Sequence, residues 1–263
     1  MLNFKGTVIG ALLIGASIIS QSAFATPSAG IKATLTGYEF SSKKDVVEVN
    51  VDAWINKSVT NKPNWVNISG DVDAGAYSGK WADNTSFVAF CVDLLQAYKP
   101  FGQSAYYTEG TFSSTVAGNL TSLANKYYSS VSDAVSSAAF QVAVWEIIYE
   151  QQGNALNLEK NKFQAEATEE WQGWFIFGKW VTDPESKAAI DLAQTWLAGV
   201  NDDSVLATGD YSLTYLKNKS YQDLVVFTAV AAVPEPATYG MLLLGMGVMA
   251  LVARRRRANT IRF

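Results

Sequence analysis

The sequence predicts an α+β fold, in which an antiparallel β-barrel or β-sandwich core carries a helical insertion. Apolar and polar residues alternate with the period of a β-strand over most of residues 31–95, and this alternation returns over residues 211–231. Between these stretches, apolar residues recur at the helical spacing of three and four. Strands at both ends of a chain with helices between them are typical of an α+β domain. We expect a single domain over residues 26–232, because 49% of the chain is hydrophobic and one sizeable core can bury it.

The first 25 residues have the composition of a signal peptide. Lys5 is followed by an apolar stretch from Thr7 to Ile19 and then by Ala23-Phe24-Ala25, which is an A-x-A cleavage site. The alternative, a permanent membrane anchor, needs roughly 20 apolar residues, and this stretch is shorter. We therefore expect an exported protein.

Five strands are expected in the first part of the mature chain. The first four form an antiparallel meander and are separated by residues that favour turns. They are expected near Ile31–Phe40, Val46–Trp54, Trp65–Ile68 and Ala74–Trp81. The fifth, Ser86–Leu95, is mostly apolar on both faces, so we expect it to lie inside the protein. A polar loop rich in tyrosine over residues 98–110 and a short helix over Leu120–Tyr128 follow.

The clearest helix of the sequence spans Ser130 to Gln151. One stripe of this helix is apolar except for a glutamine, and its members are Ala134, Ala138, Gln141, Trp145 and Ile148. Burying an unpaired amide costs about 1–3 kcal/mol. We therefore expect the helix to pack on the strand that carries Cys91, where the Gln141 side chain finds a partner.

The last third of the chain predicts a loop with a hairpin, a helix and two strands. The loop covers residues 150–170, and an aromatic cluster follows at Trp171, Trp174, Phe175, Phe177 and Trp180. We expect these aromatic residues to belong to the core, with stacking on sugar rings as the alternative. Asp183 and Pro184 then begin a helix that ends near Gly199, and the final strands are expected at Tyr211–Leu216 and Tyr221–Ala231.

Cys91 is the only cysteine of the chain, and Gln141 is its expected partner. A cysteine thiolate is a strong nucleophile, and a glutamine side chain offers a carbonyl carbon with ammonia as the leaving group. Attack followed by loss of ammonia would produce a thioester cross-link. The alternatives are a cysteine that is a small buried hydrophobe and a glutamine that bonds to a neighbouring backbone.

Two short motifs around these residues resemble the internal thioester domains of bacterial surface proteins. The motifs are Phe90-Cys91-Val92-Asp93 and Phe140-Gln141-Val142-Ala143-Val144-Trp145. The resemblance implies a protein that reacts once, when an amine or hydroxyl group on a target surface attacks the thioester and stays attached.

A reactive bond of this kind has to be kept from water. We expect the apolar neighbours Phe90, Val92 and Trp145 to limit the access of water. The bond would also close a loop of about 50 residues, which stabilises the fold by roughly 4 kcal/mol in the chain-entropy model. A cross-link that is only a structural staple is therefore the alternative.

The C-terminal segment over residues 233–263 predicts a sorting signal. Pro234-Glu235-Pro236 is followed by an apolar run from Ala237 to Ala253, expected to be a short transmembrane helix, and then by Arg254, Arg255, Arg256 and Arg257. An ordinary tail anchor is one interpretation. The order of these three parts resembles the PEP-CTERM sorting signal of Gram-negative bacteria. That resemblance implies processing by an exosortase-type enzyme, a precursor held transiently in the inner membrane, and release to the cell surface or an exopolysaccharide matrix.

Composition argues against catalysis and against nucleic-acid binding. The chain has no histidine, which excludes a Ser-His-Asp triad, a Cys-His dyad and histidine-based metal sites. We expect no cofactor, no metal and no enzyme activity. A glycosidase is the enzyme alternative, but Glu146 and Glu150 have the spacing of a solvated helix face.

The charge of the domain restricts its partners. Residues 26–233 contain 14 lysines against 23 acidic residues, and this negative net charge repels nucleic acid and anionic lipid.

A second function class is a non-covalent module that binds polysaccharide or matrix through the tryptophan cluster.

Overall fold

The computed structural model describes residues 30–42, 46–56, 65–150, 154–174, 177–231, 244–250 and 254. The expected signal peptide, the Pro234-Glu235-Pro236 segment and Arg255, Arg256 and Arg257 lie outside the described residues.

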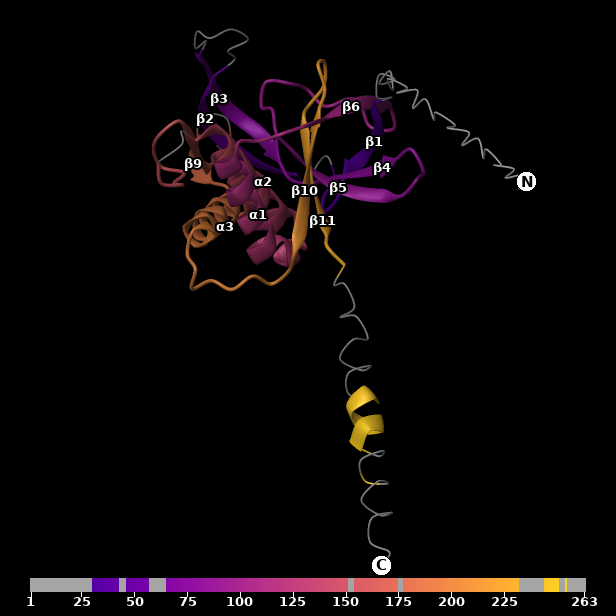
Figure 1. The fold of residues 1–263 in the computed structure, drawn as a ribbon. Helices are drawn as coiled ribbons and strands as arrows, with labels where there is room; N and C mark the ends of the chain where they lie inside the picture. The colour runs from indigo at the N-terminus through magenta and orange to yellow at the C-terminus, as the bar shows by residue number, and fades with distance from the viewer. Residues whose placement is uncertain are drawn as a thin grey trace, which may run out of the picture. The chain divides into compact units, whose positions relative to one another are not determined.

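Six antiparallel strands close into a barrel, and the cysteine strand is one of them. Their order around the barrel is β1 (Ile31–Tyr38), β4 (Tyr77–Trp81), β5 (Ser86–Cys91), β11 (Leu224–Ala229), β10 (Tyr211–Lys217) and β6 (Ser104–Gly110). A second sheet contains β3 (Trp65–Ala74), β2 (Val47–Asn56) and β7 (Phe163–Ala167), and β8 (Glu169–Trp174) pairs with β9 (Phe177–Thr182) in a hairpin. The barrel is drawn in Figure 1.

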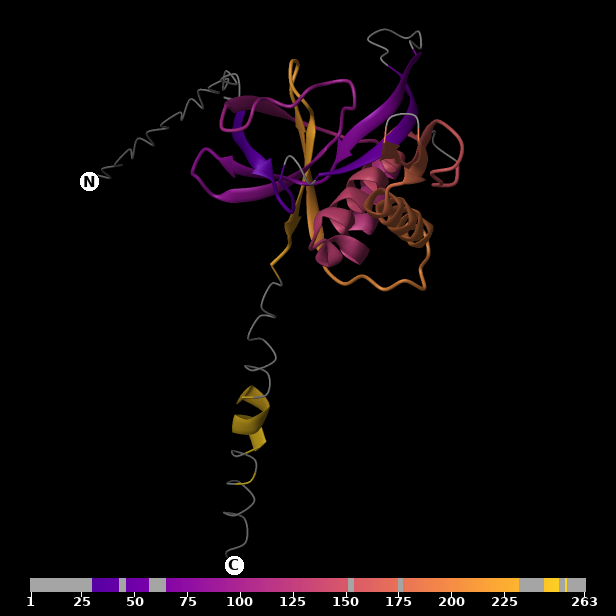
Figure 2. The ribbon, with the colours of Figure 1, turned by 180° about the vertical axis from the view of Figure 1, so that it is seen from behind.

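Three α-helices gather on one side of the barrel, next to β2 and β3, in both views of the molecule (Figures 1 and 2). They are α1 (Ser114–Tyr127), α2 (Ala134–Tyr149) and α3 (Pro184–Val200), with a single 3-10 turn η1 (Tyr128–Ser130) after α1. Asp133 caps α2 in a capping box with Ser136, and Asp183 caps α3 ahead of its first-turn proline. The expected fold class, an antiparallel barrel with a helical insertion whose main helix meets the cysteine strand, is confirmed.

The expected meander of the first four strands is wrong. Strand β1 pairs with β4 and β6, whereas β2 pairs with β3 and β7 in the second sheet. One face of β2 is buried, and β2 packs against α2 and α3. A period of two residues predicts a strand with one buried face, but it does not say which sheet the strand joins.

Several boundaries also differ from the expectation. Strand β3 continues to Ala74 rather than Ile68, β5 ends at Cys91 rather than Leu95, and α1 begins at Ser114 rather than Leu120. The tyrosine-rich loop contains a strand, β6, and the loop after α2 contains β7. Tertiary pairing decides these ends, because strand propensity depends on the neighbouring strands.

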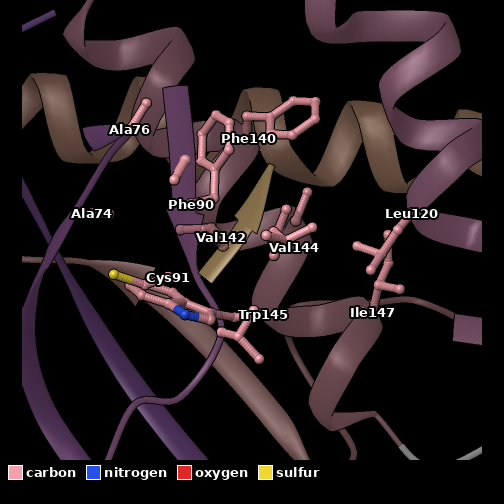
Figure 3. Packing of buried hydrophobic residues seen from close by; sticks show 14 of the residues in the cluster. Ala74, Ala76, Phe90, Cys91, Leu120, Phe140, Val142, Val144, Trp145 and Ile147 are labelled. Atoms are coloured by element: carbon pink, nitrogen blue, oxygen red, sulfur yellow. The ribbon is translucent and has the colours of Figure 1, made fainter. Parts of the chain in front are cut away.

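Helix α2 is buried around most of its circumference, and not only along the stripe that contains Gln141. Every residue from Ser136 to Ile147 is buried, and Glu146 is 0% exposed. A helix that is apolar on all sides lies in the centre of its domain. Its Phe140 ring packs with Phe90 of β5 at a centroid distance of 4.7 Å, and both belong to the buried cluster of Figure 3.

Phe175 of the expected aromatic cluster lies outside the described residues. The other four aromatic residues do not belong to the core, which corrects the expectation. They lie on the β8–β9 hairpin, where the exposed fractions are 42% for Trp171, 87% for Trp174, 78% for Phe177 and 62% for Trp180. The hairpin that carries them is a two-stranded sheet of its own.

In the C-terminal segment, the structure describes residues 244–250 and Arg254, and assigns them to a helix. Within the described part of the chain, no helix has both the length and the apolar character that crossing a membrane requires.

Glu146 provides a test of this packing. Burial raises the pKa of Glu146 to about 8, with Glu150 adding to the shift and the Asn157 N–H opposing it. The folded state therefore keeps a proton that the unfolded chain releases near pH 4.5, so the contribution to stability is complete below that pH and is lost as the pH rises through 8. We expect Glu146→Gln to stabilise the fold at pH 8 by up to a few kcal/mol and to change little at pH 4.

Unfolding free energies of the parent and the variant across this pH range test the prediction. The exposed Glu159→Gln variant is the control, and its stability should follow that of the parent. Parallel pH profiles for the parent and Glu146→Gln would contradict the expectation.

Candidate functional site

The Gln141 side chain forms two hydrogen bonds with the backbone of Cys91. The Cys91 N–H donates to Gln141 Oε1 at 2.8 Å, and Gln141 Nε2 donates to the Cys91 carbonyl at 2.9 Å. Gln141 is 1% exposed and Cys91 is 4% exposed, so both bonds lie inside the protein. The amide carbon of Gln141 is thus held beside the residue that carries the only thiol.

The sheet leaves the Cys91 backbone groups available for this contact. The ladder between β4 and β5 ends at the pair of Tyr77 and Ala89, so β4 does not reach Cys91. On the other side, Cys91 lies opposite Leu224, and the next hydrogen bond runs from Val92 N–H to the Asp223 carbonyl. Gln141 therefore takes the place of a strand neighbour, which satisfies two buried polar groups.

A second side chain of α2 also bonds to this strand end. The Tyr149 hydroxyl donates to the Val92 carbonyl at 2.7 Å and accepts from the Leu94 N–H at 2.9 Å. Tyr149 follows Gln141 by eight residues, which places the two on neighbouring parts of the helix surface. Together they hold the chain where it leaves the barrel.

The thiol of Cys91 lies in an environment of tyrosines. Burial raises the pKa of Cys91 to about 12, the neighbouring Tyr77 hydroxyl offsets part of this shift, and Asp93 adds to it. The thiol is therefore protonated at neutral pH, whereas the sequence suggested a thiolate. Cys91 in turn contributes to the raised pKa of Tyr77, Tyr107 and Tyr149, whose first cause is burial.

Sequence reasoning missed Tyr77 and Tyr149, whereas Tyr107 belongs to the tyrosine-rich loop for which covering the bond and simple packing were the two interpretations. Tyr149 had a usable signal, because it falls near Gln141 on the helix surface. Tyr77 lies on β4 and Tyr107 on β6, and their closeness to Cys91 depends on the closure of the barrel.

The three residues expected to shield the bond are all buried but lie in different places. Phe90 is 0% exposed, and its ring packs with Phe140, Tyr128 and Phe227. Because side chains alternate along a strand, Phe90 points to the face of β5 opposite to that of Cys91. Val92 and Trp145 are also buried, and Figure 3 shows Trp145 in the same part of the cluster as Cys91. The Trp145 Nε1 group has no hydrogen-bond partner in the described structure.

A cleft of about 670 Å³ borders the end of the cysteine strand. Val92, Asp93 and Tyr149 line it from one side, and Tyr215, Lys217 and Asp223 from the other. Neither Cys91 nor Gln141 lines this cleft, whereas Val92, the next residue after Cys91, and Tyr149 do.

The arrangement has the parts that acyl transfer requires. The Cys91 N–H is already directed at the carbonyl oxygen of Gln141, which is the atom that becomes negative when a nucleophile adds to the amide carbon. The second hydrogen bond fixes the orientation of the nitrogen that would leave.

The hydrogen bonds of Gln141 can be tested apart from any cross-link. In a Cys91→Ala background, we expect Gln141→Met to cost roughly 2–5 kcal/mol, because it leaves two buried backbone groups of residue 91 unpaired and each costs about 1–3 kcal/mol. Chemical unfolding of the single and double variants measures this difference. Gln164→Met at an exposed position is the matched control and should change stability by less than about 0.5 kcal/mol. Equal costs for the two glutamine variants would rule out the stabilising role of the pair.

Comparison with known proteins identifies the tail. Residues 232–257 match the PEP-CTERM protein-sorting motif, so the chain carries a sorting tail for export, as the sequence predicted. A search of curated proteins finds no match.

Three solved structures resemble the fold. One is the N-terminal domain of the Streptococcus pyogenes pilus tip adhesin Cpa, with 12% identity, a TM-score of 0.38, and coverage of 74% of this chain and 100% of that one. Another is the N-terminal thioester domain of the fibronectin-binding protein SfbI from Streptococcus pyogenes, with 13% identity, a TM-score of 0.37, and coverage of 74% and 99%. A third is an N-terminal thioester domain of a Clostridium perfringens surface protein, with 16% identity, a TM-score of 0.34, and coverage of 59% and 89%. Two of the three are described as thioester domains, the family that the Cys91 and Gln141 motifs resemble. All three TM-scores lie below 0.5, so the chemistry of this chain rests on its own residues.

Proposed function

We propose that this chain is an exported surface protein in which Cys91 and Gln141 condense to an internal thioester that attaches covalently to a target surface. The observation that carries the proposal is the pair of hydrogen bonds between the Gln141 amide and the Cys91 backbone, at 2.8 and 2.9 Å. They hold a nucleophile and an electrophile together although 50 positions separate them in sequence.

In the first step, the sulfur of Cys91 adds to the amide carbon of Gln141. The Cys91 N–H stabilises the negative charge on the carbonyl oxygen, the bond from carbon to nitrogen breaks, and the nitrogen leaves as ammonia with the proton of the thiol. The products are one thioester and one ammonia. Since the thiol is protonated at neutral pH, this transfer of the proton to the leaving group is a necessary part of the step.

In the second step, an amine or hydroxyl group of the target attacks the thioester carbonyl. An amide or ester then joins the target to the side chain of residue 141, and Cys91 recovers its thiol. The bond is used once, so the protein is a covalent binder and not an enzyme.

A thioester must survive water until the target arrives. Trp145 would provide the apolar surroundings of the bond, with Val92 at the strand end, while Phe90 would exclude water from the other face of β5. Tyr77 and Tyr149 would cover the sulfur and the strand end. The cleft beside Val92 and Tyr149 is the side from which a nucleophile would approach.

The alternative is a cross-link that serves only as a staple, in a module that binds polysaccharide or matrix without a covalent bond. Cys91→Ala separates the two ideas. If the protein attaches covalently, this variant should no longer attach to the target. If the cross-link is only structural, the variant should be less stable but should still bind.

The location of the protein is also part of the proposal. The sorting motif supports processing by an exosortase-type enzyme near Pro234-Glu235-Pro236. The precursor would be anchored transiently in the inner membrane of a Gram-negative bacterium by residues 237–253 and the arginines that follow. The processed domain would then reach the cell surface or an extracellular polysaccharide matrix.

Intact mass tests the bond directly. We expect the purified protein to be lighter than its sequence by one ammonia, and methylamine to add to residue 141 while it frees one thiol. Cys91→Ala and Gln141→Ala are the controls, and both should show the full mass of their sequences. Fresh protein with the full mass and a freely titrating thiol would refute the thioester.

The tail is tested in the producing organism. We expect the chain to be cut within the Pro234–Pro236 linker, so that the mature protein ends before Ala237 and is found outside the inner membrane. Mass analysis of the C-terminal peptide from surface and membrane fractions measures this. Recovery of the arginine-terminated tail from the surface fraction would mean that the segment is only an anchor.

A further inference from the structure

The β8–β9 hairpin presents aromatic side chains to solvent. Trp171 lies directly opposite Trp180 across the hairpin, and Trp174 lies opposite Phe177. Since side chains alternate along a strand, the pair of Trp171 and Trp180 occupies one face and the pair of Trp174 and Phe177 the other. Exposed aromatic clusters of this kind mark binding surfaces rather than packing.

Two glycines shape the face that carries Trp171 and Trp180. Gly173 and Gly178 are opposite each other next to this pair. A Cβ atom on Gly178 would lie 2.6 Å from Cζ2 of Trp171, so the indole lies against the hairpin in the space that the glycine leaves. The two indoles meet edge to face, with centroids 5.6 Å apart and an interplanar angle of 66°. The result is a broad aromatic surface that a side chain at position 178 would disrupt.

The Trp180 side of the hairpin forms one wall of a cleft of about 760 Å³. The opposite wall comes from the second sheet and from α3, and it is polar. Its members include Asn50, Asp71, Glu166, Lys187 and Asp191. Neither Trp174 nor Phe177 lines the cleft, in agreement with their place on the other face of the hairpin.

The charge of this cleft restricts the ligand. Five carboxylates line it, from Asp71, Glu159, Glu166, Glu169 and Asp191, against one lysine. Lys187 is paired with Asp191 at 2.7 Å, and Asn50 donates to Asp71 at 2.7 Å. An anionic polymer or an anionic membrane would be repelled here. The charge alone would attract a basic peptide, so the aromatic wall decides in favour of a sugar ring.

We propose that this cleft binds a neutral polysaccharide. The C–H faces of a sugar ring are apolar and fit flat against an indole, while its hydroxyl groups are donors that carboxylates and amides accept. In this cleft, the aromatic wall can stack on the C–H face of the sugar, and the carboxylates and the amide opposite can accept hydrogen bonds from its hydroxyl groups. This site does not involve Cys91 or Gln141, so the inference is independent of the thioester.

Native gels that contain a dissolved polysaccharide test the site on the full-length chain. The neutral polymers are dextran, pullulan, hydroxyethyl cellulose, a galactomannan and the neutral fraction of the matrix of the producing strain, and alginate and hyaluronate are the anionic ones. We expect at least one neutral polymer, and neither anionic one, to retard the protein. Trp180→Ala and Glu166→Gln should each weaken binding by about tenfold, equivalent to roughly 1.4 kcal/mol.

Two control variants test the position of the site. Trp174→Ala removes the most exposed aromatic residue of the hairpin from the face that does not line the cleft, and Tyr106→Ala removes an exposed aromatic residue from the barrel. Both should bind as the parent does. Unfolding curves show whether each variant is folded. If Trp180→Ala does not fold, the loss of binding in Glu166→Gln still tests the site.

Three results would overturn the proposal. One is no retardation by any neutral polymer. Another is an equal loss of binding in Trp174→Ala and Trp180→Ala, which would indicate general adhesion by the hairpin. The third is capture by phosphatidylcholine vesicles or by polylysine that depends on the same tryptophans while the neutral polymers have no effect, which would assign the hairpin to a membrane or to a basic partner.

Discussion

The pairing of the Gln141 amide with both backbone polar groups of Cys91 is the contact on which the site depends. It requires that α2 lie in the interior, because only a buried helix brings its side chain to a central strand. It also requires that β4 end before Cys91, since a longer β4 would occupy the same backbone groups. The helix, the short strand and the tyrosines around the sulfur are thus parts of one arrangement.

The contact between Cys91 and Gln141 was predictable from the sequence, and its surroundings were not. A lone cysteine on an apolar strand and a glutamine among apolar helix residues are both unusual at such positions, so the two residues can be recognised as candidates for a site. Tyr77 and Tyr107 cannot be recognised in this way, because tyrosine is a common residue in β-strands. The period of two residues predicted most of the strands but not their partners, so β2 was assigned to the wrong sheet.

The burial of the aromatic residues on the β8–β9 hairpin could not be predicted from their residue type. Trp171, Trp174 and Trp180 have the residue type and spacing of core strand residues, yet they are exposed because β8 and β9 pair only with each other. The glycines between them were the usable signal. A core strand is stabilised by the side chains that it packs, whereas the missing side chain of Gly178 leaves room for the Trp171 indole on an exposed surface.

The closure of the barrel has a consequence for the order of events during folding. Strand β11 pairs directly with the cysteine strand, Leu224 opposite Cys91, although most of the domain separates them in sequence. Contacts between such distant segments form late. The dry surroundings of Cys91 are therefore complete only when β11 has joined the barrel. A chain interrupted before residue 224 would hold its cysteine in an unfinished barrel, so the proposed thioester would be protected from water only after the last strand has paired.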